Sequence, residues 1–280
     1  MLEIARYQVV KAARAVGIGL KQTFAKEGKT LRRKAGGYAH AKQFKRLRRT
    51  LKRQRTVLGI VLREVQRKLP TASTEFRSSL ARLSALMERA ERIRTRQRKD
   101  KHKLYALHAP EVECISKGKA RQRYEFGVKT SIAVTHRSGL MVGARSFPGN
   151  PYDGHTLAPQ REQTRILLED FGVEPKQAVV DLGYRGVDAE NLGVQIIHRG
   201  KYQSLTLQQR RWLKRRQAVE PAIGHLKHDC RMERCWLRGA TGDAVHAVLC
   251  AAGYNLRWLL RAIVRCRLKP LFLRLWAWWC

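Results

Sequence analysis

The spacing of the apolar residues changes once along the chain, near Pro110, and this change limits the folds that the sequence can adopt. Before it, apolar residues recur at three- and four-residue steps with basic residues between them, which is typical of amphipathic helices. After it, β-rich runs alternate with helical stretches, which predicts a mixed α/β layer. We therefore expect a helical segment over residues 1–104, an α/β core over residues 105–265 and a Trp-rich tail over residues 266–280.

A long antiparallel helical hairpin is predicted within the first segment. One apolar face has helical spacing and consists of Phe44, Leu47, Leu51, Leu58, Val61, Val65 and Leu69. Pro70 interrupts this pattern. A second apolar face follows and consists of Phe76, Leu80, Leu83, Met87 and Ile93. Two helices joined by so short a break are expected to pack in opposite directions.

Positive charge is concentrated in the same segment. The chain has 58 Lys and Arg against 22 Asp and Glu, a formal net charge of +36, and residues 1–104 hold 30 of the basic and 7 of the acidic residues. This excess indicates a polyphosphate partner, DNA first, while packing on RNA or on an anionic membrane stays open on charge alone. We expect Lys45, Arg48 and Arg49 to contact DNA, and other basic side chains of the segment to form a solvated surface.

The chain shows no features of a secreted or membrane protein. Its first residues are amphipathic and lack the apolar core of a signal peptide, so we expect a cytoplasmic, nucleoid-associated protein. No run reaches the roughly 20 apolar residues of a membrane span. The most apolar stretch, residues 244–260, carries His246 and Arg257, and we interpret it as a buried helix.

The six cysteines have no regular spacing, which favours reduced thiols over a disulfide framework. Four side chains close together in the sequence could be imagined around zinc: His225, His228, Cys230 and Cys235. Their spacing matches no common zinc module. Scattered core thiols and solvated histidines are the better interpretation.

The second segment has the order hairpin, helix, strand, strand, helix. Two β-rich runs around a short turn predict the hairpin, and short apolar runs predict the later strands. The elements cover residues 126–136 with 139–147, 157–172, 176–181, 192–200 and 205–229. Gly172 is expected to stop the first helix. Pro221 is expected to kink or break the last helix.

Two acids stand out as candidates for chemistry. Asp181 closes an apolar strand and precedes the turn LGYRG, a position where α/β proteins place ligand-binding groups, although a turn-capping aspartate explains the isolated segment equally well. Glu220 lies on a predicted helix, with Arg216 one turn before it and Lys227 two turns after it. These three side chains can share one side of the helix.

The same residues carry a resemblance to a known family. VVDLGYRG, followed by Arg216, Glu220 and Lys227, resembles the second acid and the signature helix of bacterial insertion-sequence transposases of the DDE type, which have an RNase H-like core. Other segments extend the similarity, to the insertion-sequence-five type, over nearly the whole chain: RRKAGGYAHAKQFKRLRRTLKRQRT, HAPEVECISKGKARQRYEFGVK, FPGNPYDGHTL and MERCWLRGATGDAVHAVLCAAGYNLRWLL. The signature's Tyr before the Arg is replaced here by Leu213.

The resemblance implies metal-dependent DNA cleavage and strand transfer. Asp181 and Glu220 would be catalytic residues and ligands of Mg²⁺ (or Mn²⁺), two ions of which can stabilise the attacking and leaving oxygens. Arg216, Lys227 and Arg185 would contact DNA phosphates. The implied partners are the terminal inverted repeats of the element, target DNA and further copies of the chain in a homo-oligomer, with no membrane.

In the resembling proteins the first acid lies on a first core strand ahead of the basic helices. This chain starts within that helical segment, so we expect an α/β fold with an RNase H-like mixed sheet that lacks its first strand and the first catalytic Asp. We expect weak or no catalysis by this chain alone. Asp153 could be proposed as a substitute, but a structural loop role is favoured. Asp188 and Glu190 are interpreted as solvated acids at a helix start.

Two other function classes stay open on the sequence. One is a structural protein that binds nucleic acid through its basic helices, without sequence preference and with steep salt dependence. The other is a metal-dependent nuclease with a similar core but no strand transfer. Preference for inverted repeats separates a transposase from both classes, and joining of cleaved ends separates it from a nuclease. The apolar tail, residues 266–280, fits either packing on the core or a subunit interface.

Overall fold

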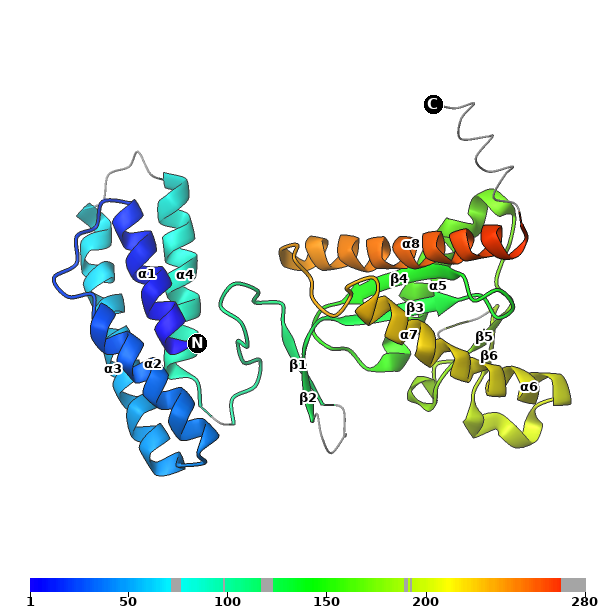
Figure 1. Cartoon of the computed structure of the whole chain (residues 1–280), viewed down its shortest axis with the longest axis horizontal. Helices are drawn as coiled ribbons and strands as arrows, with labels where there is room; N and C mark the ends of the chain where they lie inside the picture. Colours follow the sequence, from blue (N-terminus) through cyan, green and yellow to red (C-terminus); the bar gives the residue numbers. More distant parts are fainter. Residues whose placement is uncertain (72–76, 98, 117–122, 189–190, 192, 268–280) are drawn as a thin grey trace. The chain divides into compact units, whose positions relative to one another are not determined.

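A computed structural model describes residues 1–71, 77–97, 99–116, 123–188, 191 and 193–267. The chain forms two compact units that divide between Val112 and Glu113, a few residues beyond the change of apolar spacing (Figure 1). In their described residues, the first unit contains helices without strands, and the second combines helices with strands. The mixed α/β character predicted for the second part is confirmed.

The first unit contains more helices than the predicted hairpin. The helices are α1 (Leu2–Ala15), α2 (Ala25–His40), α3 (Phe44–Lys68) and α4 (Arg77–Thr95). The hairpin corresponds to α3 and α4, and α1 packs against both, while α2 packs against α3 (Figure 1). The core of the unit contains Val9, Leu58, Val61, Val65 and Leu83, all fully buried.

The predicted apolar faces are largely confirmed within this unit. Leu58, Val61 and Val65 of α3 are fully buried against the other helices, as the spacing indicates. Phe44 is the exception, because it begins α3 and is 57% exposed. Phe76 lies outside the described residues. Helical spacing therefore located the inner face but not the point along the helix where burial begins.

A buried carboxylate joins the start of the unit to α3. Glu64 Oε1 accepts hydrogen bonds from the backbone N–H of Lys21 (2.7 Å) and from Lys68 Nζ (2.9 Å). These two donors, the backbone N–H first, lower the pKa of Glu64 below its usual value. The loop after α1 is thereby held on α3, which is a contact that no local pattern predicts.

The second unit has three separate two-stranded sheets among its described residues, in place of the single mixed sheet that the resemblance implies. Two pairs are antiparallel and one is parallel. The pairs are β1 (Glu113–Ser116) with β2 (Tyr124–Gly127), β3 (Lys129–Val134) with β4 (Met141–Phe147), and the parallel β5 (Gln177–Val179) with β6 (Gln195–Ile197). The predicted hairpin is β3 with β4, and it is shorter than expected because β2 takes residues 124–127.

The helices of this unit are α5 (Leu157–Leu168), α6 (Leu207–Arg215), α7 (Val219–His228) and α8 (Gly239–Arg265). Gly172 ends the α5 region in a left-handed conformation, as predicted. The predicted helix over 205–229 is broken into α6 and α7 by a 3₁₀ turn, Arg216–Ala218. Pro221 therefore lies in the first turn of α7, where its missing N–H breaks no helical hydrogen bond.

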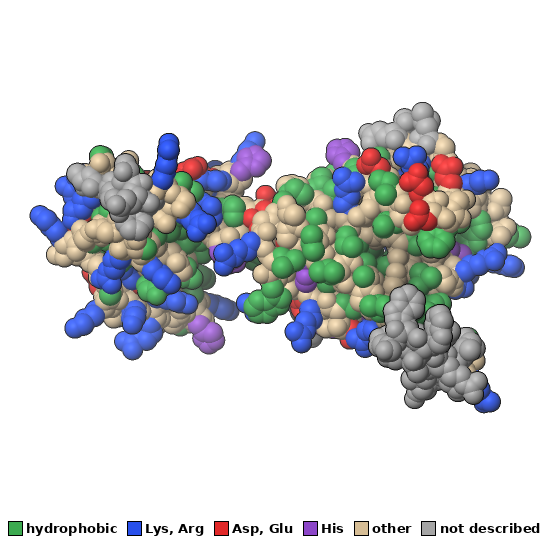
Figure 2. Space-filling view, turned by 90° about the horizontal axis from the view of Figure 1, so that it is seen from above, with side chains coloured by type: hydrophobic (Ala, Val, Ile, Leu, Met, Phe, Trp, Pro, Cys, Tyr) green, Lys and Arg blue, Asp and Glu red, His purple; other side chains and the backbone are tan. Residues whose placement is uncertain are grey.

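The prediction that α8 is a buried helix is wrong for its outer face. One face packs on β4 and buries Ala247, Cys250 and Ala251 (Figure 1). The opposite face exposes a row of apolar side chains that includes Val245, Val248, Leu249, Leu256 and Leu260. Figure 2 shows hydrophobic side chains gathered on this surface of the unit. Among the described residues, α8 alone is long and apolar enough to cross a membrane, which is weak evidence for a span because its other face covers a sheet.

Candidate active site at the ends of β5 and α7

Asp181 lies just beyond the carboxyl end of β5, beside the parallel strand β6. The strand pairing continues past the assigned residues, because Val180 N–H donates to the carbonyl of Ile197 (2.9 Å). Asp181 Oδ1 accepts from the N–H of Leu182 (2.7 Å) and so caps the turn that follows, Leu182–Tyr184. Its side chain is 63% exposed. Asp181 thus caps a turn and also faces solvent at the position where α/β proteins bind ligands.

The break between α6 and α7 brings a cation to this aspartate. Arg216 Nη2 lies 3.6 Å from Asp181 Oδ2. Glu220 is one turn farther along, in the first turn of α7, and is exposed. Within the described part of the chain, its carboxylate makes no hydrogen bond or ion pair. Arg216 of the sequence pattern therefore lies beside Asp181. Asp181 is held by Arg216 and by the N–H of Leu182, while Glu220 has no such partner among the described residues.

Two further basic residues predicted for the site lie in different surroundings. Lys227, near the end of α7, lies 3.7 Å from Glu125 Oε2 of β2. Arg185 is exposed just after the turn that Asp181 caps. The structure thus places Arg216 next to Asp181, while Lys227 has an acidic partner of its own.

His198 is a residue at this sheet edge that sequence reasoning missed. It follows β6 directly and, in the parallel register, stands level with Val180. It is only 5% exposed, and its Nδ1 accepts from the N–H of Gly200 (3.0 Å). Burial lowers the pKa of His198, and Lys201 lowers it further, so the neutral ring is favoured. The sequence feature that could have identified His198 is its position directly after the apolar residues Ile196 and Ile197.

Asp188 is an exposed acid, as the sequence suggested, but it also has a basic partner. Its carboxylate accepts a hydrogen bond from Lys201 Nζ, which also donates to the carbonyl of Ile196 (3.3 Å). The hydrogen bond from Lys201 lowers the pKa of Asp188. No local sequence pattern indicated this partner, because Lys201 lies 13 residues farther along the chain. Glu190 lies outside the described residues.

A family model described as "Transposase DDE domain" matches residues 90–256, more than half of the chain. The chain belongs to this family. The matched region contains Asp181, Arg216, Glu220 and Lys227, so the acids and cations of the candidate site fall within the transposase domain. No curated protein and no solved structure gives a significant match.

DDE transposases generally use divalent metal ions, which require oxygen or nitrogen ligands from the protein. Asp181 and Glu220 offer carboxylate oxygens, the hard donors that Mg²⁺ prefers. No group of three or more His, Cys, Asp or Glu that could hold a metal occurs in the part of the chain that the structure describes. The chemistry of the two carboxylates therefore suits Mg²⁺, an ion that usually keeps several waters and binds one or two protein carboxylates together with phosphates.

Three of the four residues imagined around zinc, His225, His228 and Cys235, contact other groups instead. His225 Nδ1 lies 2.8 Å from Asp229 Oδ2, and His228 Nδ1 lies 3.9 Å from Glu233 Oε2. Cys235 Sγ lies 3.6 Å from the carbonyl oxygen of Leu237. In the part of the chain that the structure describes, these residues form no group that could hold a metal ion.

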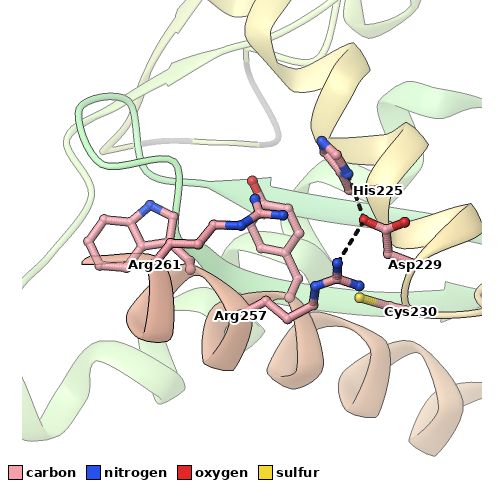
Figure 3. A pocket seen from close by; sticks show the side chains of 7 residues that line it. His225, Asp229, Cys230, Arg257 and Arg261 are labelled. Carbon is pink, nitrogen blue, oxygen red and sulfur yellow. Dashed lines mark hydrogen bonds and ion pairs between the residues drawn. The ribbon is translucent and has the colours of Figure 1, made fainter. Parts of the chain in front are cut away.

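A small cavity between α7 and α8 of the transposase domain is also distinct from the candidate site. Figure 3 shows His225 of α7 and Arg257 of α8 both pointing at Asp229, at 2.8 and 3.5 Å. The cavity has a volume of about 20 Å³ and is lined by His225, Asp229, Cys230, Tyr254, Arg257, Trp258 and Arg261. It has room for about one water molecule. The cavity is therefore too small for a nucleotide, and the contacts that line it hold α7 and α8 together.

The basic residues predicted to contact DNA through the helical unit lie on the outer surface of α3. Lys45, Arg48 and Arg49 are all exposed. They lie outside the region that the transposase family model matches. Their exposure leaves their ammonium and guanidinium groups accessible to a phosphate backbone.

Proposed function

We propose that this DDE transposase has an RNase H-like core and belongs to a bacterial insertion sequence of the insertion-sequence-five type. It cleaves DNA at the terminal inverted repeats of its element and joins the ends to target DNA. One observation carries the proposal: Asp181, at the end of a parallel strand pair, lies beside Arg216. Glu220 follows Arg216 by one helical turn, and its carboxylate has no hydrogen-bond or ion-pair partner among the described residues.

Asp181 and Glu220 are the proposed catalytic residues and would hold Mg²⁺ or Mn²⁺. When bound, the metal supplies positive charge that stabilises the attacking and leaving oxygens of a phosphodiester. Asp181 offers one oxygen, because its other oxygen accepts from Leu182 N–H. Glu220 is exposed, and among the described residues it makes no hydrogen bond or ion pair that a metal would have to displace.

Basic side chains around the two acids would position the DNA. Arg216 lies between the acids along the chain and can donate to a phosphate that approaches Asp181. Arg185 and Lys227 flank the same elements. In the helical unit, Lys45, Arg48 and Arg49 would contact phosphates farther from the chemistry, where they add affinity but no sequence preference.

The chain by itself is proposed to be a weak catalyst. Among the described residues, no third acid joins Asp181 and Glu220 in a metal-binding group. With fewer carboxylates, the metals lose ligands and charge compensation. We further propose that the protein acts as a homo-oligomer in the cytoplasm, on nucleoid DNA.

A cleavage assay tests this function. Supercoiled DNA that carries the inverted repeats flanking the coding sequence is incubated with the full chain and Mn²⁺. Slow nicking near the repeats is expected, and it should be lost in Asp181→Ala and in Glu220→Ala. Glu174→Ala, an exposed acid of the same unit, is the control and should nick like the wild type.

Nicking that survives Asp181→Ala would overturn the assignment. A specific observation favours a second candidate, a non-specific nucleic-acid-binding protein: the excess of basic over acidic residues in 1–104. That candidate predicts equal affinity for repeat and unrelated DNA and no nicking with any metal.

A further inference from the structure

The loop that follows β4 lies against the turn that Asp181 caps. Gly183, in the middle of this turn, faces the side chain of Asp153. A methyl group at Gly183 would lie 2.7 Å from Asp153 Oδ2 and 3.3 Å from Asp153 Cβ. The first distance is shorter than side-chain carbon contacts allow, so the backbone of the turn touches the carboxylate because residue 183 has no side chain.

The other side of Asp153 is held by the β3–β4 sheet. Lys129, the first residue of β3, donates from Nζ to Asp153 Oδ1 (2.8 Å) and to the carbonyl of Pro151. The Lys129 side chain is 22% exposed, so its ammonium depends on these acceptors in place of water. One carboxylate oxygen of Asp153 therefore accepts a hydrogen bond from the first residue of β3, and the other lies against Gly183.

Two more contacts hold the same loop and turn together. Thr156 Oγ1 donates to the carbonyl of Asp153 (2.7 Å) and lies 3.4 Å from the hydroxyl of Tyr184. Val187 is buried with Leu157 and Ile196 in a small apolar cluster. The C-terminal end of the turn after Asp181 is thus tied to the loop that contains Asp153.

We propose that Asp153 is a positioning residue for Asp181. Lys129 orients the Asp153 carboxylate, that carboxylate sets where Gly183 lies, and the Leu182 N–H of the same turn holds Asp181 Oδ1. The direction in which Asp181 presents its second oxygen then depends on Asp153. This inference rests on the proposed function, because it assigns Asp153 a role toward an acid that is itself a proposal.

The contacts of Asp153 favour positioning over direct metal ligation. Its Oδ1 already accepts a hydrogen bond from the Lys129 ammonium, and its Oδ2 lies against Gly183. Side chains that orient a metal ligand typically change metal affinity by about 10- to 100-fold when they are lost. Loss of a positioning role for Asp153 should therefore change metal affinity by an amount that can be measured.

A double-mutant cycle tests the proposal on the full chain. Gly183→Ala, Asp153→Ala and the double variant are compared by hydrogen exchange of the amides of residues 181–186 and by calorimetric titration with Mn²⁺. Gly183→Ala should speed exchange and weaken Mn²⁺ binding about 10-fold. In the double variant the clash with Asp153 Oδ2 is gone, so Gly183→Ala should cost clearly less than it does alone.

Gly224→Ala is the matched control. Gly224 lies in α7, and a methyl group there meets no atom within 4 Å, so exchange at 181–186 and Mn²⁺ binding should match the wild type. Asp153→Asn keeps the volume of the side chain and weakens its ion pair with Lys129. It should show an intermediate loss, and it replaces the alanine variants in the comparison if these fail to fold.

Additive effects in the cycle, or Asp153→Asn exchange equal to that of the wild type, would overturn the positioning role. Failure of the proposed function looks different. In that case the wild type binds no Mn²⁺ with or without repeat DNA, while the exchange data alone decide whether Asp153 and Gly183 are coupled.

Discussion

Arg216 Nη2 lies 3.6 Å from Asp181 Oδ2, although the two residues are 35 positions apart in the sequence. The contact exists because the α6–α7 helix pair breaks at a 3₁₀ turn just where Arg216 leaves α6. It brings together two residues that the sequence pattern had connected only by family resemblance. The proposed metal-binding acid therefore has a cation beside it before any DNA arrives.

Replacing Arg216 should weaken DNA binding and reduce its dependence on salt. If Arg216 contacts one phosphate, Arg216→Ala should lower the slope of log K against log salt by about 1. Fluorescence anisotropy with labelled repeat DNA at several salt concentrations measures this slope. Arg165→Ala, an exposed arginine of α5, is the control. A slope equal to that of the wild type in Arg216→Ala would argue against a phosphate contact.

Glu220 should matter for metal binding and not for stability. It is exposed and has no partner among the described residues, so Glu220→Ala should change the free energy of unfolding by less than about 0.5 kcal/mol. Mn²⁺ binding should be lost in the same variant. Urea unfolding and calorimetry measure the two properties. A large loss of stability would show that Glu220 supports the fold instead.

The helical unit should lose stability in acid through Glu64. Its pKa is lowered in the fold, so its contribution is present above the unfolded value of about 4.5 and disappears as the pH falls through the lower folded value. Glu64→Gln should therefore cost about 1–2 kcal/mol at pH 7. The cost should shrink toward zero at acid pH.

Urea unfolding of both proteins from pH 7 down to acid pH measures the effect of Glu64→Gln. Glu88→Gln, on the exposed side of α4, is the control and should change little at any pH. A cost of Glu64→Gln that does not depend on pH would contradict the link to ionisation.

Neighbouring residues of α8 should respond in opposite ways to substitution. Asn255 accepts from Met141 N–H and donates to the Met141 carbonyl, both at 2.8 Å, so Asn255→Ala should cost about 1–3 kcal/mol. Leu256 is 62% exposed, and Leu256→Gln should change stability by less than about 0.5 kcal/mol. Denaturant unfolding compares the two. Equal losses would mean that the outer face of α8 is covered in solution.

Local patterns predicted the parts of this protein that depend on neighbours in the chain. Helical spacing located the inner face of α3, Gly172 ended the α5 region, and Pro221 marked the break between α6 and α7. These features follow from side-chain periodicity and backbone geometry within a few residues. The spacing of Arg216, Glu220 and Lys227 carried the resemblance to transposases, which the family match confirms.

Contacts between distant residues were decided only by the tertiary structure. Segments far apart in the sequence meet where α1 docks on α3 and α4, and where Lys129, Asp153 and Gly183 contact one another. The burial of His198 and the exposure of the outer face of α8 also depend on distant segments. A periodic pattern shows that a face is apolar but not what covers it, and an acid in a loop shows nothing of the cation that will reach it. Which strands pair, and which charged side chains meet, depends on loop closure over the whole chain. A window of a few residues does not contain this information.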